Sequence, residues 1–227
     1  MEKENNPGAI RAIQRAFAIL SCFGSENSSA TLTELARQTD LPTTTVTRVL
    51  STLKSIHYIR RQKDGRYAVG SQLVRLALTA LQSIRLYDIA SVYLERLSQE
   101  TGETANLAIR DENGQAFYVH HVPSRQAIRH ESWLGKKLPS KGSVNVAALR
   151  GEVGIEGFVS SRKTIEKDVT AIAAPVFGPD RSIQGSFCVT GPSFRISDQD
   201  IKTIGKCVVK AARAASLELG APLDDDR

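Results

Sequence analysis

The sequence lacks the features that mark a secreted, membrane-spanning or disulfide-bonded protein. It has only three cysteines, Cys22, Cys188 and Cys207, and their odd number and wide spacing exclude a disulfide framework and a zinc cluster. No apolar run reaches the length needed to span a bilayer, and the polar N-terminus lacks the apolar segment of a signal peptide. We therefore expect a soluble cytoplasmic protein that does not act at a membrane.

Catalytic and metal-binding patterns are also missing. The sequence contains no Gly-x-Ser-x-Gly nucleophile motif and no phosphate-binding loop. His120 and His121 are adjacent, so on a strand they point to opposite faces. His130 could approach one of them, but a metal site needs three or more well-placed ligands, and ordinary strand histidines are the simpler interpretation. We predict neither an enzyme nor a bound metal or cofactor.

The sequence has an excess of positive charge, and this excess lies at one end. The 227 residues carry a net charge of +6. Residues 1–85 hold 12 Lys and Arg against 6 Asp and Glu, whereas residues 86–227 hold 18 of each. This distribution is typical of a protein in which one region meets a polyanion and the other does not. The length predicts one or two domains.

Residues 31–55 have the pattern of two helices joined by a turn. Thr31 and Glu34 have capping-box spacing, which predicts the start of the first helix. Asp40, Leu41 and Pro42 end that helix and begin the next, with Pro42 in its first turn. Apolar residues recur at helical spacing on one face of the second helix; they are Val46, Val49, Leu50 and Leu53. This arrangement predicts a helix-turn-helix, which places its second helix in the DNA major groove.

The opposite face of the second helix carries short hydroxyl side chains and one arginine. A plain solvent-facing surface is the alternative interpretation, but threonine is only a moderate helix former and is a poor choice for a face that merely meets water. Hydroxyls and arginine suit both base edges and phosphates. The predicted groove contacts are Thr44, Thr45, Thr47, Arg48 and Ser51, and Thr43 is predicted to contact phosphate.

A basic hairpin follows the second helix. Residues 58–61 and 67–69 are strand-like, and Asp64-Gly65 between them is a strong turn signal. Four basic side chains cluster at the turn: Arg60, Arg61, Lys63 and Arg66. They could simply protect an edge strand from aggregation. Beside a recognition helix we instead predict a wing whose basic side chains contact phosphates or the minor groove.

Helices flank this region on both sides. Residues 10–23 predict a support helix with Ile13, Phe17 and Leu20 on its buried face and Arg11 and Arg15 outside. Residues 71–84 and 87–101 predict two further helices. The first of these carries several leucines on an exposed face, and dimerisation is a reasonable source of a partner.

From residue 102 the apolar period changes to that of strands. Strands are predicted at 104–110, 116–122, 128–133, 169–176 and 186–190, with a loop and short helix near 141–148. Ser197 and Asp200 then cap a final helix, whose predicted buried face is Ile201, Ile204, Val208, Ala212 and Ala215. Strands followed by a packing helix predict an α+β domain.

The chain resembles the IclR family of bacterial transcription regulators. The matching segments follow the family's order along nearly the whole chain. They are residues 10–20 (IRAIQRAFAIL), 32–36 (LTELA), 41–50 (LPTTTVTRVL), 65–70 (GRYAVG), 100–108 (ETGETANLA), 171–177 (AIAAPVF) and 189–192 (VTGP).

The resemblance implies a repressor-like regulator whose winged helix binds double-stranded operator DNA. It further implies a GAF-like C-terminal domain that binds a small-molecule effector, a carboxylate or aromatic metabolite, and assembly as a homodimer or dimer of dimers. The effector-binding residues carried over by position are Val144, Asn145, Ser161, Ala171, Cys188 and Thr190. Taken by itself, Cys188 has the position of a small core residue.

The chain departs from the family in one segment. Family members have several helices between the positions of residues 139 and 157, whereas only residues 140–156 remain here. An alternative function is therefore a regulator whose shortened C-terminal domain is ligand-independent and serves oligomerisation or a protein partner.

The expected fold class is α+β, with an N-terminal winged helix-turn-helix joined by a linker helix to a GAF-like sensor domain built on an antiparallel sheet. We expect the DNA-binding domain at residues 1–70, the linker helix at 71–86, the effector-binding domain at 87–220 and a disordered acidic tail at 221–227.

Overall fold

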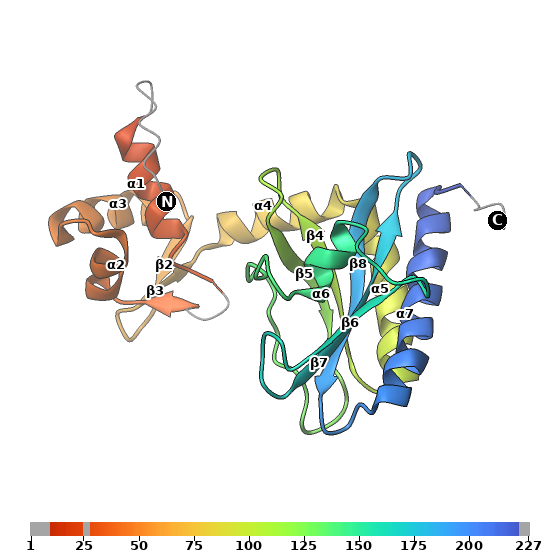
Figure 1. The fold of residues 1–227 in the computed structure, drawn as a ribbon. Coiled ribbons are helices and arrows are strands. Elements are labelled where there is room, and N and C mark those ends of the chain that lie inside the picture. Colours follow the sequence, from red (N-terminus) through yellow and green to blue (C-terminus); the bar gives the residue numbers. More distant parts are fainter. Residues whose placement is uncertain (1–9, 25–27, 223–227) are drawn as a thin grey trace. The chain divides into compact units, whose positions relative to one another are not determined.

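A computed structural model describes residues 10–24 and 28–222. The acidic tail predicted to be disordered, residues 221–227, lies outside the described residues, apart from residues 221 and 222. Tertiary contacts divide the chain into two compact units, residues 1–81 and 82–227. Each unit is described by itself (Figure 1).

The N-terminal unit is a winged helix-turn-helix. Its elements are α1 (Arg11–Leu20), β1 (Ser29–Ala30), α2 (Leu32–Thr39), α3 (Thr43–Ser55), β2 (Ile59–Arg61), β3 (Tyr67–Val69) and α4 (Ser71–Gln82). The strands form an antiparallel sheet in the order β1-β3-β2. The two predicted helices and the hairpin are present, and the short strand β1, which had not been predicted, completes the sheet.

The helix-turn-helix has the local chemistry that its sequence predicts. Thr31 caps α2 by accepting the Glu34 amide, and the Glu34 carboxylate accepts the Thr31 amide. Asp40 ends α2 in the left-handed conformation. Pro42 is the N-cap of α3, one position before its predicted first-turn place. Gly70 lies between the wing and α4. Only glycine fits there, because a Cβ at this position would clash with the His57 carbonyl oxygen.

The predicted buried face of the first helix is wrong at two of its three positions. Ile13 and Phe17 are 52% and 61% exposed, whereas Leu20 is partly buried against the core. Ile19, which was not predicted, is fully buried beside Leu35 and Leu50. Hydrophobic periodicity identifies an apolar face but not the surface that covers it. Helix α4 has no buried side chain, in agreement with the exposed leucines that the sequence predicts for it.

The C-terminal unit is a five-stranded antiparallel sheet with helices on both faces. Its elements are α5 (Arg85–Thr101), β4 (Thr104–Arg110), β5 (Ala116–Val122), α6 (Val144–Leu149), β6 (Val159–Arg162), β7 (Val169–Phe177), β8 (Ile183–Pro192) and α7 (Asp198–Leu219). The strand order is β5-β4-β8-β7-β6. Helices α5 and α7 cover one face, and α6 packs on the other (Figure 1).

The strand predicted at 128–133 is absent among the described residues, and the segment is irregular. Only isolated bridges follow it, from Leu134 to Tyr118 and from Lys137 to Phe117. Strand β6 had not been predicted, because its four residues alternate partly buried and exposed side chains too briefly to give a clear signal.

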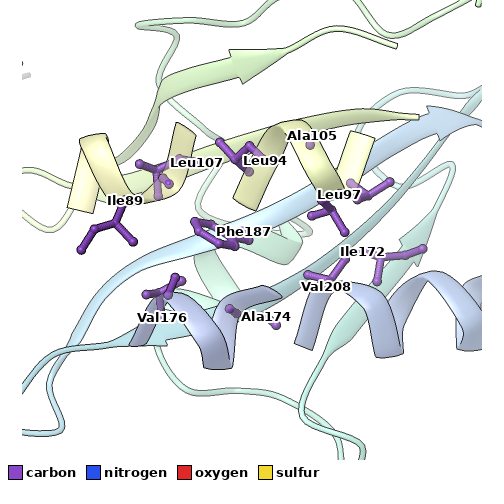
Figure 2. Close-up of a cluster of buried hydrophobic side chains, with 14 of the residues drawn as sticks. Ile89, Leu94, Leu97, Ala105, Leu107, Ile172, Ala174, Val176, Phe187 and Val208 are labelled. Atoms are coloured by element: carbon purple, nitrogen blue, oxygen red, sulfur yellow. The ribbon is translucent and has the colours of Figure 1, made fainter. Parts of the chain in front are cut away.

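Successive side chains of each strand point to opposite faces of the sheet, and they form one packed layer on each face. Phe187 and Val189 of β8 enter the core beneath α5 and α7, together with Ile172 and Ala174 of β7 (Figure 2). The intervening residues of these strands face α6, where Cys188 packs in a smaller cluster. Helix α7 buries the predicted face, and Ile204, Val208, Ala212 and Ala215 are each less than 9% exposed.

Candidate nucleic-acid interface and small-molecule pocket

Helix α3 is held by one face and presents the other to solvent. Val46, Leu50 and Leu53 are buried against α1 and α2. The predicted groove and phosphate residues lie on the remaining surface. Thr43, Thr44, Thr47, Arg48 and Ser51 are exposed, and Thr45 is partly buried.

One threonine hydroxyl on this surface is already oriented by the helix itself. The Thr47 hydroxyl donates to the Thr43 carbonyl oxygen at 2.8 Å. Such a bond fixes the side-chain rotamer, while the oxygen keeps lone pairs that can accept from a nucleic-acid base. The surface of α3 is therefore a row of short polar groups around the exposed Arg48, with the Thr47 hydroxyl held in place by the helix.

The wing is a tight hairpin with a left-handed glycine. Gly65 has a φ of +85°, and the Asp64 carboxylate accepts the Arg66 amide at 3.1 Å. Arg60, Arg61 and Lys63 are exposed. The Arg61 guanidinium lies 5.8 Å from the centre of the Tyr67 ring, close enough for a cation–π contact.

Arg66 differs from the other three basic residues of the wing. Its guanidinium donates to the Ser29 hydroxyl at 3.0 Å, to the Ser29 carbonyl oxygen at 2.8 Å and to the Glu34 carboxylate at 3.1 Å. Hydrogen bonds from Thr31, and secondarily the charge of Arg66, lower the pKa of the Glu34 carboxyl. The structure thus uses Arg66 to fasten the wing to the start of α2.

The C-terminal unit contains a small cavity on the α6 side of its sheet. Its volume is about 40 Å³, which is room for a few water molecules. Five predicted effector residues line it: Val144, Asn145, Ser161, Ala171 and Thr190. They come from the start of α6, from β6 and from the two central strands, so residues far apart in the sequence meet here.

Cys188 lies behind the cavity rather than on its wall. Its sulfur is 4.0 Å from the Tyr118 hydroxyl, and Tyr118 is a lining residue. Burial raises the pKa of the Cys188 thiol to about 11 and also raises the pKa of Tyr118. Both groups are therefore neutral near pH 7, and Cys188 has no thiolate character for redox or nucleophilic chemistry.

Two chains of hydrogen bonds hold polar lining residues of the cavity in place. In one, Asn145 donates to the Tyr118 hydroxyl at 2.8 Å and accepts from the Ser186 hydroxyl at 2.9 Å. In the other, Asn106 donates to the Thr190 hydroxyl at 3.2 Å and its carbonyl oxygen lies 2.8 Å from Nδ1 of His121. Buried polar groups with this many partners hold one geometry.

The polar lining residues that the sequence missed include Tyr118, His130 and Glu166. His130 had been weighed only as a metal ligand, and the described residues contain no group of three candidate ligands. Its Nε2 lies 2.8 Å from the Glu166 carboxylate. No local signal could have found this pair, because the two residues belong to different loops.

A wider groove of about 740 Å³ opens beside helix α7. Val209 and Leu217 of that helix and Phe177 of β7 contribute to its wall. It contains none of the residues that the sequence assigned to an effector, and it lies outside the polar layer around α6. We therefore assign the candidate effector site to the smaller cavity.

Two family models match the chain. Residues 12–63 match the IclR helix-turn-helix domain, and residues 78–149 match the bacterial transcriptional regulator IclR C-terminal domain. Together the two matches include both α3 and the start of α6. Within the described residues, no helix is long and apolar enough to cross a membrane.

Curated relatives match along almost their whole length. The acetate operon repressor of Salmonella typhimurium is 27% identical over 250 residues, which cover 94% of this chain and 91% of the relative. The transcriptional repressor IclR of Escherichia coli is 25% identical over 250 residues, with the same coverage. Since 250 aligned positions exceed the 227 residues of this chain, the alignments place gaps in it.

Solved structures share the fold. An IclR transcriptional regulator from Alicyclobacillus acidocaldarius has a TM-score of 0.77 at 20% identity and covers 93% of this chain and 100% of that one. An IclR homologue from Microbacterium hydrocarbonoxydans, complexed with 4-hydroxybenzoate, has a TM-score of 0.77 at 20% identity, covering 92% and 98%.

Proposed function

This chain belongs to the IclR family of DNA-binding transcription regulators, and we propose that α3 and the wing bind its operator while a small molecule in the α6 cavity sets operator affinity. In the proposed division, residues 1–70 bind DNA, residues 71–86 link the domains and residues 87–220 respond to the effector. The observation that carries the proposal is the exposed hydroxyl-and-arginine face of α3 beside a basic wing.

The proposed DNA contacts follow from exposure and charge. Thr44, Thr45, Thr47, Arg48 and Ser51 would meet base edges, since arginine and short hydroxyls match groove donors and acceptors. Thr43, Arg60, Arg61 and Lys63 would contact phosphates, which position a protein without reading sequence. Arg66 would act mainly by holding the wing in place, because its guanidinium already has three partners.

Selection of bound fragments from a random duplex pool tests operator recognition. We expect a defined motif, whose symmetry would follow that of the protein assembly. Binding that falls steeply with salt but selects no motif would leave only non-specific phosphate contact and would contradict the proposal.

The cavity supports an effector role for the C-terminal domain. It brings together five residues that the family pattern assigns to the effector, and a structural relative holds 4-hydroxybenzoate. The alternative of a ligand-independent domain lacks comparable support. An effector changes operator affinity only if it binds two arrangements of the protein with different affinity, so titrating candidate ligands by calorimetry with and without operator is the direct test.

We propose that the chain assembles as a homodimer or dimer of dimers. Helix α1 exposes Ile13 and Phe17, and helix α4 exposes Val74, Leu76 and Leu78, each between 51% and 61% exposed. Apolar faces of this kind are stabilised when a second copy covers them. Sedimentation equilibrium of the full chain would contradict this if it found a monomer at all concentrations.

We further propose that the protein acts as a cytoplasmic repressor and not as an enzyme. Repressors are among the curated relatives, and operator DNA is a cytoplasmic target in bacteria. A reporter gene under the selected operator should be expressed more strongly when the regulator is deleted. Reduced expression upon deletion would instead identify an activator.

A further inference from the structure

One residue that lines the cavity has a buried polar atom without a hydrogen-bond partner. His130 has a side chain only 6% exposed and lines the cavity. In the part of the chain that the structure describes, its Nδ1 is the only buried side-chain nitrogen or oxygen atom without a hydrogen bond. A buried polar atom without a hydrogen bond is unfavourable. A ligand group that forms a hydrogen bond with Nδ1 would therefore be stabilised.

The other ring nitrogen determines what Nδ1 can do. Nε2 lies 2.8 Å from a carboxylate oxygen of Glu166. An ionised carboxylate only accepts hydrogen bonds, so Nε2 carries the proton in the neutral ring. The tautomer assigned in this way leaves Nδ1 as an acceptor. In the uncharged ring, this lining residue therefore has a lone pair that lacks a donor.

The rest of the wall offers no counter-charge for an anion. Among the described residues that line the cavity, none is lysine or arginine, and Glu166 contributes a negative charge at its edge. A desolvated carboxylate is strongly unfavourable without a paired cation.

The remaining lining groups are apolar surfaces and hydroxyls. Trp133, Leu138 and Val144 provide apolar contact, and Ser143, Ser161 and Thr190 provide hydroxyl groups that can donate or accept. A site of this composition binds an amphipathic, uncharged molecule with a few placed polar contacts.

We infer that the cavity binds a small uncharged hydroxyl compound, an alcohol or a phenol, whose O–H donates to Nδ1 of His130. This inference deepens the proposed effector role and rests on it only for the regulatory consequence. The resemblance implies a carboxylate or aromatic metabolite, and of these the lining of the cavity disfavours the carboxylate.

The His130–Glu166 contact also joins two loops at the site. His130 lies in the irregular segment before α6, and Glu166 lies between β6 and β7. A volume of about 40 Å³ is smaller than the roughly 150 Å³ of cavities that hold benzene. A ring-sized alcohol therefore requires the loop that carries Glu166 to move outward, whereas a three-carbon alcohol requires less movement.

Matched probes on the full-length protein test the ligand class. The pairs are phenol with benzoate, cyclohexanol with cyclohexanecarboxylate, and 2-propanol with acetate, each titrated at neutral pH into protein labelled with nitrogen-15 at histidine. We expect at least one alcohol to shift the Nδ1 signal of His130 in a saturable way. Each carboxylate should bind at least about tenfold more weakly than its partner, because it leaves the acceptor unpaired.

Two substitutions at one position separate the two ring nitrogens. His130→Gln keeps an amide near the Nε2 position and its bond to Glu166 but removes the atom at the Nδ1 position. His130→Asn places an amide oxygen near the Nδ1 position. We expect alcohol binding, followed by calorimetry, to weaken at least about tenfold in the glutamine variant and to be largely kept in the asparagine variant. Unchanged melting temperatures would show that both variants fold.

Three outcomes overturn the inference. One is a carboxylate that binds as tightly as its matched alcohol. Another is equal loss of binding in both variants. The last is the absence of any Nδ1 shift with all three alcohols up to their solubility limits, in which case solvent alone satisfies the atom. Alcohol binding without any change in operator affinity would contradict the proposed regulation but leave the ligand class intact.

Discussion

Glu34 joins the wing to the first helix of the helix-turn-helix through one oxygen atom. Oε2 of Glu34 accepts the Thr31 amide at 2.7 Å and the Arg66 guanidinium at 3.1 Å. The same carboxylate therefore caps α2 and positions the hairpin that follows α3. Arg66, which the sequence assigned to phosphate contact, thus also fixes the wing against the start of α2.

Arg66→Ala should lower the stability of the N-terminal unit. The change removes three hydrogen bonds, but Arg66 and Glu34 are 33% and 39% exposed, so solvent screening reduces the loss to about 1 kcal/mol. Denaturant unfolding measures it. Lys63→Ala, in the same hairpin but exposed, is the control and should leave stability within about 0.5 kcal/mol. Equal losses in the two variants would contradict the scaffold role.

Arg48→Ala should weaken specific operator binding. If the exposed guanidinium reads a guanine, the loss is about 1–3 kcal/mol and is confined to one base-pair position. Affinities for the selected operator and for singly substituted sites measure it. Lys54→Ala is the control: Lys54 is exposed on the same helix, but by helical geometry it lies about 120° from Arg48. It should leave the base preference unchanged.

Phe187→Ala should strongly destabilise the C-terminal unit. Phe187 is fully buried between the sheet and helices α5 and α7 (Figure 2), and removing a buried aromatic ring costs about 3–5 kcal/mol through lost burial and a residual cavity. Phe194→Ala is the matched control, since Phe194 is 74% exposed. It should change the free energy of unfolding by less than about 0.5 kcal/mol.

Stability should fall as the pH drops below about 6.5, the ordinary pKa of histidine. Burial, followed by the charges of His130, His120 and Arg129, lowers the pKa of His121 in the folded protein. Below pH 6.5 the unfolded chain therefore binds more protons than the folded one, and acidification favours unfolding. This window extends down to the lowered pKa of the folded state.

His121→Gln isolates this contribution. The substitution should destabilise the protein more at pH 7.5 than at pH 5.5, because the wild-type histidine loses its advantage on acidification. Denaturant unfolding of both proteins at both pH values gives the comparison. A destabilisation that does not change with pH would show that His121 is not responsible.

Features that depend on a few neighbouring residues could be read from the sequence. The Thr31–Glu34 and Ser197–Asp200 capping boxes both form, since their partners lie within one helical turn. The Asp64-Gly65 hairpin and the buried face of α7 could also be predicted, because each depends on the pattern of a short continuous segment. The resemblance to a family, carried by segments in a fixed order, extended this reading to the fold and to five of the residues that line the cavity.

Contacts between distant segments were decided only by the tertiary structure. The periodic pattern of α1 could not show that Ile19, and not Phe17, faces the core, because the pattern does not identify the covering surface. Nor could it show that Arg66 turns inward to Glu34, or that His130 meets Glu166. Each of these pairs is more than thirty residues apart, and its free energy depends on burial and geometry that exist only after the chain has packed.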